Sequence, residues 1–172
     1  MKIYLIRHSE PDFSQVDAAG YTGLARDLTR LTPKGIEIAD KAAQDPAFNE
    51  IQMLLISPYT RTMQTAQEIL KYHQIPSQVE LLLHEWRPDK SGKMDVTEEQ
   101  MALAYKDYLN GTHKSDLDFE TRKEVMQRVD SVFDRYKDKY SCIGCVTHGG
   151  VMTQYTGDRM TPFCGIYEIN YK

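Results

Sequence analysis

The sequence predicts an α/β protein, a three-layer α/β/α sandwich around a mostly parallel central sheet. Two observations lead to this prediction. Short apolar segments recur along the chain, and segments with helical periodicity lie between them. Strands that alternate with helices usually form a parallel sheet that is covered by helices on both faces. Ligands of such sheets bind beyond the carboxyl ends of the strands, so functional residues are expected at that edge.

Five short apolar segments are the candidate strands, and they lie at 2–6, 52–56, 79–83, 142–147 and 165–169. One of them contains Cys142 and Cys145, whose spacing also occurs in redox and zinc sites. Residues three apart on a strand point to opposite faces, so these two sulfurs are expected to diverge. We therefore interpret the cysteines as small apolar core residues.

Four helical patterns separate these strands, at 33–45, 63–73, 97–109 and 119–139. Thr32 precedes Pro33 as a helix N-cap precedes a first-turn proline. Thr97 and Gln100 have the spacing of a capping box. Between the regular elements, segments 9–31 and 86–96 look irregular, and both follow strands. They are therefore expected to lie over the carboxyl edge of the sheet.

The 172 residues are expected to form one domain, 1–172, with a small lid region around 86–115. A net charge of −4 argues against nucleic acid or an anionic membrane as a partner. The first apolar run is too short for a signal peptide, and no stretch approaches the roughly 20 apolar residues of a membrane span. We therefore expect a cytoplasmic protein, and the oligomeric state stays open.

Charged side chains gather where the predicted strands end. Arg7 and His8 end the first strand, and Arg61 lies at the start of the helix after the second. Glu85 follows the third strand by two residues, and His148 ends the fourth. Because parallel strands end at the same edge, these five side chains are expected to share one neighbourhood.

Together these residue types have the chemistry that phosphoryl transfer requires. Guanidinium groups bind the oxygens of a phosphate with paired hydrogen bonds, which suits Arg7 and Arg61 to that role. One neutral imidazole can attack phosphorus, while a second, protonated one binds the transferring oxygens. Glu85 is the candidate proton donor, because partial burial beside Trp86 would raise its pKa.

A metal-dependent site is the alternative use of histidines and acids. The arginines near both histidines would repel a divalent cation, and a binuclear phosphatase would need more carboxylates. We therefore expect neither a metal nor a cofactor.

Five segments in register resemble the motifs of the histidine phosphatase superfamily, which includes cofactor-dependent phosphoglycerate mutases and many small phosphatases. They are LIRHSE at 5–10, LTPKG at 31–35, SPYTRTMQTA at 57–66, HE at 84–85 and VTHGG at 146–150. The resemblance implies a phosphoglycerate mutase-like fold and phosphorylation of His8. It also implies that Arg7, Arg61 and His148 bind phosphate and that Glu85 donates the proton.

The chain departs from the family pattern at two places. Ser9 stands where the family usually has glycine, and its hydroxyl is small enough to fit and to contact phosphate. The asparagine with which many members contact phosphate is missing, and Asp12, Ser14 and Thr22 are the polar residues nearby. We assign no role to Ser14 or Thr22.

The expected function is that of a metal-independent phosphatase, which hydrolyses a small phosphate monoester or a phosphoprotein through phospho-His8. Two alternatives remain open: a phosphoglycerate mutase-type phosphoryl transferase, and a catalytically weak regulatory protein that binds phosphate esters. The short lid favours hydrolysis, because a mutase must shield phosphohistidine from water.

A radiolabelled phosphate ester, quenched during turnover, is expected to leave its label on His8. Phosphate on an imidazole nitrogen is lost in acid and kept in alkali, so the stability of the label identifies its attachment. A label that survives acid and is lost in alkali would place the phosphate on an acyl or ester site and would contradict the assignment.

Overall fold

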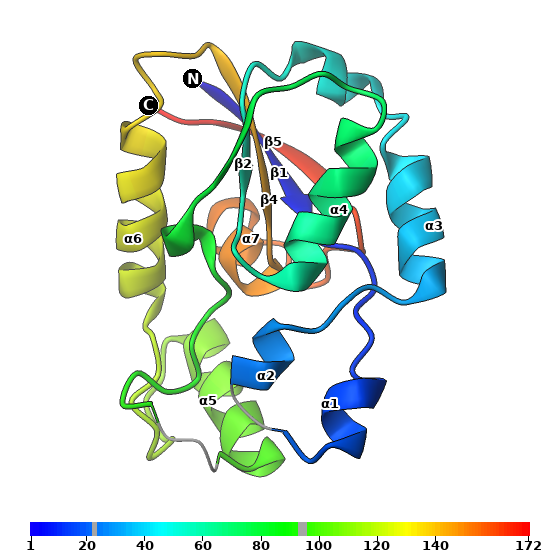
Figure 1. Ribbon diagram of the computed structural model, residues 1–172. Coiled ribbons are helices and arrows are strands. Elements are labelled where there is room, and N and C mark those ends of the chain that lie inside the picture. Colours follow the sequence, from blue (N-terminus) through cyan, green and yellow to red (C-terminus); the bar gives the residue numbers. More distant parts are fainter. Residues whose placement is uncertain (22–23, 93–95) are drawn as a thin grey trace.

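The computed structural model describes residues 1–21, 24–92 and 96–172. Its sheet consists of the strands β1 (Lys2–Arg7), β2 (Leu54–Ile56), β3 (Ser77–Val79), β4 (Cys142–Thr147) and β5 (Ile166–Asn170). Their order across the sheet is β3-β2-β4-β1-β5 (Figure 1). β1 to β4 run parallel, and β5 pairs antiparallel with β1 at one edge. The predicted mostly parallel sheet is therefore confirmed.

The α-helices are α1 (Ser14–Ala18), α2 (Leu24–Asp27), α3 (Pro33–Ala42), α4 (Thr60–Leu70), α5 (Glu98–Asn110), α6 (Arg122–Asp134) and α7 (Gly149–Thr156). Two short 3₁₀ helices, η1 (Pro46–Glu50) and η2 (Leu81–Leu83), complete the described elements. Thr32 caps α3 by accepting a hydrogen bond from the Gly35 N–H, as predicted. The capping box of Thr97 and Gln100 is also present, at the start of α5.

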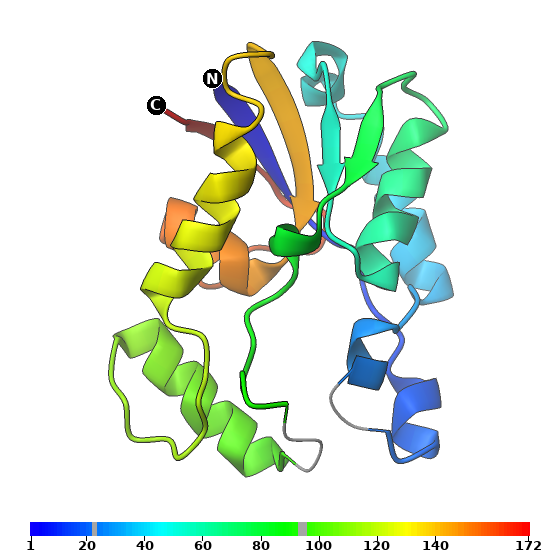
Figure 2. The same ribbon diagram turned by 60° about the vertical axis from the view of Figure 1, so that its left-hand side comes forward.

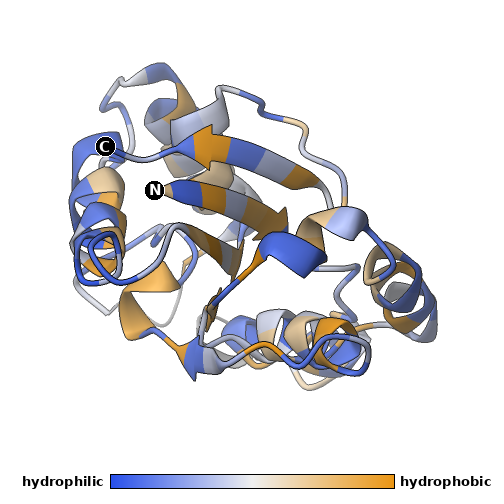
Figure 3. Ribbon diagram, turned by 90° about the horizontal axis from the view of Figure 1, so that it is seen from above, coloured by the Kyte–Doolittle hydropathy of each residue, from blue (hydrophilic) through white to orange (hydrophobic). Residues whose placement is uncertain are grey.

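Each face of the sheet has its own hydrophobic layer. On one face, Leu5 and Cys145 pack with residues of α5, α6 and α7. On the other, Ile6 and Cys142 pack with residues of α4 and η1. The two cysteines of β4 thus lie on opposite faces, which confirms the prediction from strand alternation. Figure 3 shows the strands enclosed between helices that carry many hydrophilic residues.

Three helices lie beyond the carboxyl ends of the parallel strands. In Figure 1, α1, α2 and α5 are below the sheet, whereas α3, α4, α6 and α7 lie beside it. The view in Figure 2 shows the same arrangement from a second direction. The segment 9–31, which looks irregular in the sequence, contains two of these helices, α1 and α2. The described helices of segment 9–31 therefore lie at the predicted edge of the sheet.

The third predicted strand, 79–83, is wrong in position. The strand β3 ends at Val79, and residues Leu81 to Leu83 form the 3₁₀ helix η2. A short apolar run fits a strand or a buried helical turn equally well, so periodicity could not separate them. Tertiary contacts determine that this run is a helical turn. Leu83 is fully buried, Leu81 is mostly exposed, and the chain turns away from the sheet after Glu80.

Helix boundaries also differ from the predictions. The first predicted helix ends at Ala42, because Asp45 and Pro46 begin the separate helix η1. The helix predicted at 119–139 is shorter and spans 122–134. Within the described ranges, no helix is long and apolar enough to cross a bilayer.

Gly35 lets α3 approach the loop after β1 very closely. A Cβ atom on Gly35 would lie 2.4 Å from the Glu10 carbonyl oxygen, which is backbone and has little freedom to move. The Ser9 hydroxyl donates a 2.6 Å hydrogen bond to the Gly35 carbonyl from the same loop. The close approach therefore helps to fix the chain next to His8.

Gly35→Ala is expected to lower the free energy of unfolding by about 1–3 kcal/mol, although alanine is the better helix former. Chemical denaturation measures the change. Glu37→Ala, at an exposed position of the same helix, is the control and should leave stability nearly unchanged. A Gly35→Ala protein as stable as the wild type would show that the loop yields without cost.

Candidate active site

The pairing of β1 with β4 brings the two histidines together. Arg7 stands opposite Thr147 in the parallel register, and the His8 N–H donates a 3.0 Å hydrogen bond to the Thr147 carbonyl. Consequently His8 and His148, each the first residue after its strand, have ring centroids only 5.2 Å apart. The strand register therefore builds the centre of the site.

His8 is held in one tautomer. Its Nδ1 lies 2.7 Å from the Ser9 carbonyl oxygen, which can only accept, so Nδ1 carries the proton. Nε2 is left with its lone pair and receives a 3.3 Å hydrogen bond from Arg61 Nε. The Ser9 carbonyl thus orients the ring with an unprotonated nitrogen toward Arg61, as an attacking imidazole requires.

Arg61, on the first turn of α4, links both histidines. Its Nη2 donates to His148 Nδ1 at 3.4 Å, and its Nη1 donates to the Arg26 carbonyl at 3.1 Å. The side chain is buried against the Tyr59 ring, 4.7 Å from its centroid. These contacts fix the guanidinium between His8, His148 and α2.

His148 is completely buried and is held from two sides. Arginine only donates, so Nδ1 of His148 accepts from Arg61, and Nε2–H donates to Ser57 Oγ at 2.7 Å. The Tyr59 ring packs against the imidazole with its centroid 4.8 Å away. Burial first, and then the neighbouring His8 and Arg61, hold the pKa of His148 well below its usual value.

Arg7 reaches the site from the last position of β1. Its Nη1 donates to the Thr161 carbonyl, and its guanidinium lies 4.7 Å from the centroid of the Phe163 ring. Arg7 Nε is the one buried side-chain nitrogen or oxygen in the described residues that lacks a hydrogen-bond partner. A Cβ on Gly149 would lie 3.4 Å from this nitrogen, so the glycine keeps its surroundings open.

Glu85 meets the start of α7. Its Oε2 accepts a 3.3 Å hydrogen bond from the Gly150 N–H, and its Oε1 accepts a 2.7 Å bond from the Trp86 N–H. A Cβ on Gly150 would lie 2.6 Å from Oε1, so only glycine permits this approach. Burial of the carboxyl raises the pKa of Glu85, and the Trp86 N–H and Arg61 partly offset that effect. A carboxyl with a raised pKa is suited to proton transfer near neutral pH.

The structure thus places the five sequence-predicted residues at one edge of the sheet, with Arg61 in direct contact with both histidines. Ser9 is not part of this group, because its hydroxyl donates to Gly35 and is fully buried. Ser14, the exposed first residue of α1, hydrogen-bonds Asp12, and Thr22 lies outside the described residues.

Tyr59 and Asp27 are site residues that the sequence did not reveal. Tyr59 contacts His148 and Arg61 with its ring and hydrogen-bonds the Asp27 carboxyl. Burial raises the pKa of Asp27, and Arg61 and Arg87 counteract this as nearby positive charges. No motif points to Asp27, since α2 reaches the site only through the tertiary fold. The only sequence feature that could have pointed to Tyr59 is its position two residues before Arg61.

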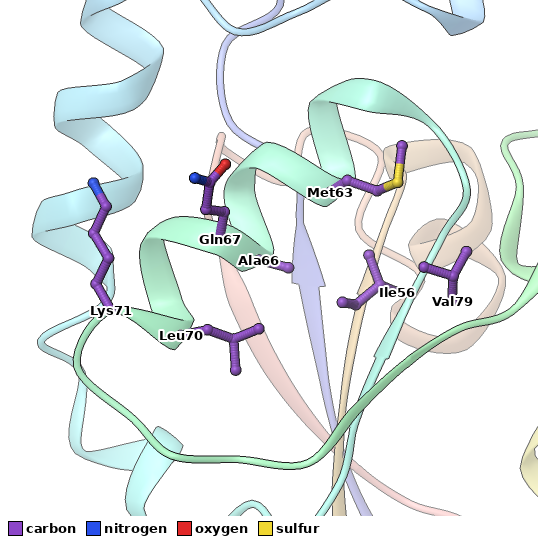
Figure 4. A pocket seen from close by; sticks show the side chains of 7 residues that line it. All are labelled: Ile56, Met63, Ala66, Gln67, Leu70, Lys71 and Val79. Carbon is purple, nitrogen blue, oxygen red and sulfur yellow. The ribbon is translucent and has the colours of Figure 1, made fainter.

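Two open surface grooves are lined by none of the five sequence-predicted residues, although Phe163, which packs against Arg7, lines the second. One, with a volume of about 440 Å³, runs between α4 and the ends of β2 and β3 and is lined mainly by apolar side chains (Figure 4). Its one charged side chain, Lys71, forms an ion pair with Glu68. The other, of about 680 Å³, lies between α3 and the segment before β5. In the described part of the chain, no group of three or more His, Cys, Asp or Glu side chains is placed to hold a metal ion.

His8 is expected to stay neutral in the folded protein down to strongly acidic pH. Burial, and secondarily the charge of Arg61, lower the pKa of His8 from 6.5 to about 3. NMR titration of the His8 ring should show no protonation between pH 8 and about pH 4. The same ring in the urea-unfolded protein is the control, and titration of folded His8 near 6.5 would contradict the prediction.

The same shift has a consequence for stability. Between pH 6.5 and about 3 the unfolded chain binds a proton at His8 that the folded chain does not bind. The contribution of His8 therefore lowers the free energy of unfolding as the pH falls through this window.

The comparisons with known proteins agree with this fold. An Escherichia coli protein assigned as an alpha-ribazole-5'-P phosphatase is 27% identical, with a TM-score of 0.64 over 95% of this chain and 81% of that one. Bacillus anthracis phosphoglycerate mutase is 16% identical, with a TM-score of 0.71 over 100% of this chain and 88% of that one. A mycobacterial glucosyl-3-phosphoglycerate phosphatase is 17% identical, with a TM-score of 0.67 over 89% and 76%.

No curated protein sequence matches the chain significantly. The family model of the histidine phosphatase superfamily (branch 1), however, matches residues 3–161, which is nearly the whole chain. The chain is a member of the histidine phosphatase superfamily.

Proposed function

We propose that this chain is a metal-independent phosphatase that hydrolyses phosphate monoesters through a phosphohistidine on His8. One observation carries the proposal. The unprotonated Nε2 of His8 faces Arg61, and Arg61 also contacts His148. A nucleophilic nitrogen within a group of buried donors matches the charge distribution of phosphoryl transfer.

The donors around His8 suit a phosphate dianion. Arg61 lies next to the nucleophile, and Arg7 Nε has an N–H without a partner in the buried part of the site. α4 and α7 begin at this edge of the sheet, and neither has a side-chain cap at its N-terminus, so both direct positive dipole ends toward it. A bound phosphate would also favour protonation of His148 at Nδ1, which would make that nitrogen a further donor.

In the first step His8 Nε2 attacks phosphorus, and the bond from phosphorus to the leaving oxygen breaks. The Glu85 carboxyl transfers its proton to that oxygen, and the alcohol departs. The raised pKa of Glu85 supports this role, because more of the carboxyl is protonated near neutral pH. The Nδ1–H of His8 stays on the Ser9 carbonyl, which stabilises the positive charge that develops on the ring.

In the second step water attacks phospho-His8. The Glu85 carboxylate accepts a proton from the water, the bond from nitrogen to phosphorus breaks, and inorganic phosphate leaves. Both the His8 lone pair and the Glu85 proton are thereby restored.

Charges around the site favour hydrolysis over mutase chemistry. A mutase binds a second anionic group, and here Asp27 adds a carboxyl beside Tyr59 and Arg61. Lys90, in the proposed lid region, makes ion pairs with Asp118 and Glu124. The 27% identity to a protein assigned as an alpha-ribazole-5'-P phosphatase also supports a small phosphate ester as substrate.

Wild-type protein is expected to hydrolyse p-nitrophenyl phosphate in excess EDTA, and His8→Ala is expected to abolish this activity. His73→Ala is the matched control, because His73 lies beyond the end of α4, and its described contacts, with the Ala43 carbonyl and the Phe48 ring, do not involve the five site residues. Activity that EDTA removes would contradict a metal-independent mechanism. Tight binding of inorganic phosphate without turnover would instead indicate a regulatory binding protein.

A further inference from the structure

A buried ion pair behind Glu85 has no role in the mechanism above. Arg128 of α6 and Glu120, just before that helix, are each more than nine-tenths buried, with side-chain exposures of 9% and 8%. Arg128 donates to both carboxylate oxygens of Glu120, from Nε at 2.5 Å and from Nη2 at 3.0 Å. The pair is therefore a bidentate contact with fixed geometry.

The same arginine also binds the backbone that carries Glu85. Its Nη1 donates to the Leu82 carbonyl at 2.6 Å, and its Nη2 donates to the Glu85 carbonyl at 3.2 Å. One planar group thus bonds the chain on both sides of His84. Because the guanidinium is rigid, these bonds fix the position of the Glu85 Cα relative to α6.

Glu120 binds the residues that follow. Its Oε2 accepts from the Arg87 N–H at 3.2 Å, and its carbonyl accepts from Trp86 Nε1 at 2.6 Å. The Glu120 N–H donates to the Arg87 carbonyl at 2.9 Å. Glu85 therefore lies in a short non-helical segment that is held at both ends. Arg128 binds the backbone at Leu82 and Glu85, and Glu120 binds the backbone at Arg87.

We propose that Arg128 and Glu120 are positioning residues for proton transfer, which hold the Glu85 carboxyl at the distance that leaving-group protonation requires. They touch no reacting atom and act through the backbone of residues 82–87. The inference rests on the proposed function, in which Glu85 protonates the leaving oxygen. A buried ion pair is weak evidence for stability alone, because desolvation offsets most of its attraction.

The role is tested by the basicity of the leaving group. A p-nitrophenolate leaves with little help from an acid, whereas an alkoxide such as that of glycerol 2-phosphate must be protonated. General acids contribute about 10²–10⁴ in rate, and a displacement of about 1 Å can cost about 10². Arg128→Lys keeps the positive charge but removes the planar guanidinium, whose two Nη atoms donate to the Leu82 and Glu85 carbonyls.

We expect Arg128→Lys to lower kcat/KM for glycerol 2-phosphate by about 10²-fold and kcat/KM for p-nitrophenyl phosphate by less than about threefold. The ratio kcat/KM is compared because it reports the step in which the leaving group departs and excludes the later hydrolysis of phospho-His8, which both substrates share. The inhibition constant of inorganic phosphate should stay the same, because the phosphate-binding groups are untouched. In a Glu85→Gln background the added effect of Arg128→Lys should vanish, since no proton remains to be positioned.

Arg135→Lys is the matched control. Arg135 is the C-cap residue of the same helix and pairs with Glu80 before η2, and none of its hydrogen bonds reaches residues 82–87. It should show no dependence on the leaving group. If Arg128→Lys lowers the folded fraction, the double variant Arg128→Gln/Glu120→Gln, which leaves no buried charge unpaired, gives the same comparison.

An equal loss on both substrates, or an additive loss in the Glu85→Gln background, would overturn the positioning role while leaving the phosphatase function intact. Absence of turnover by the wild type on both substrates would overturn the proposed function and this inference with it. A selective loss on the alkyl ester supports the inference, because a purely structural role lowers both rates alike.

Discussion

The parallel pairing of β1 with β4 is the constraint on which the site depends. Arg7 lies opposite Thr147, and the His8 N–H continues the ladder by one hydrogen bond to the Thr147 carbonyl. A slip of one residue would send His8 and the strand side chains to the other face of the sheet. Register is strongly specified here, because β1 and β4 are buried on both faces between two hydrophobic layers.

The positive charges of this arrangement cost free energy of desolvation. Arg7 and Arg61 lie beside two histidines in surroundings of low polarity, and those surroundings keep both imidazoles neutral. The fold stabilises the guanidinium groups with carbonyl acceptors and aromatic rings, namely Thr161, Arg26, Phe163 and Tyr59. Such partners hold the cations in place without neutralising them, so their charge stays available to an anionic ligand.

Glu85, the proposed proton donor, is supported by the other hydrophobic layer of the molecule. Glu85 approaches α7 because Gly150 has no side chain, and burial of its carboxyl raises the pKa. Its backbone is bonded to α6, which packs on the face of the sheet opposite α4. Arg61, which contacts His8, and Glu85, the proposed proton donor, are thus anchored to helices on different faces, and they meet at the carboxyl edge.

The sequence by itself determined the alternation of strands and helices, the caps at Thr32 and Thr97, and the five motif residues at the strand ends. These follow from local patterns, because periodicity, capping and motif spacing involve residues close in the chain. Only the tertiary structure decided that 81–83 is a 3₁₀ turn and that the Ser9 carbonyl fixes the His8 tautomer. It alone placed Asp27 beside Tyr59 and Arg61, and Arg128 against the backbone of Glu85. Such contacts join residues far apart in sequence, and their energies depend on burial that no local pattern contains.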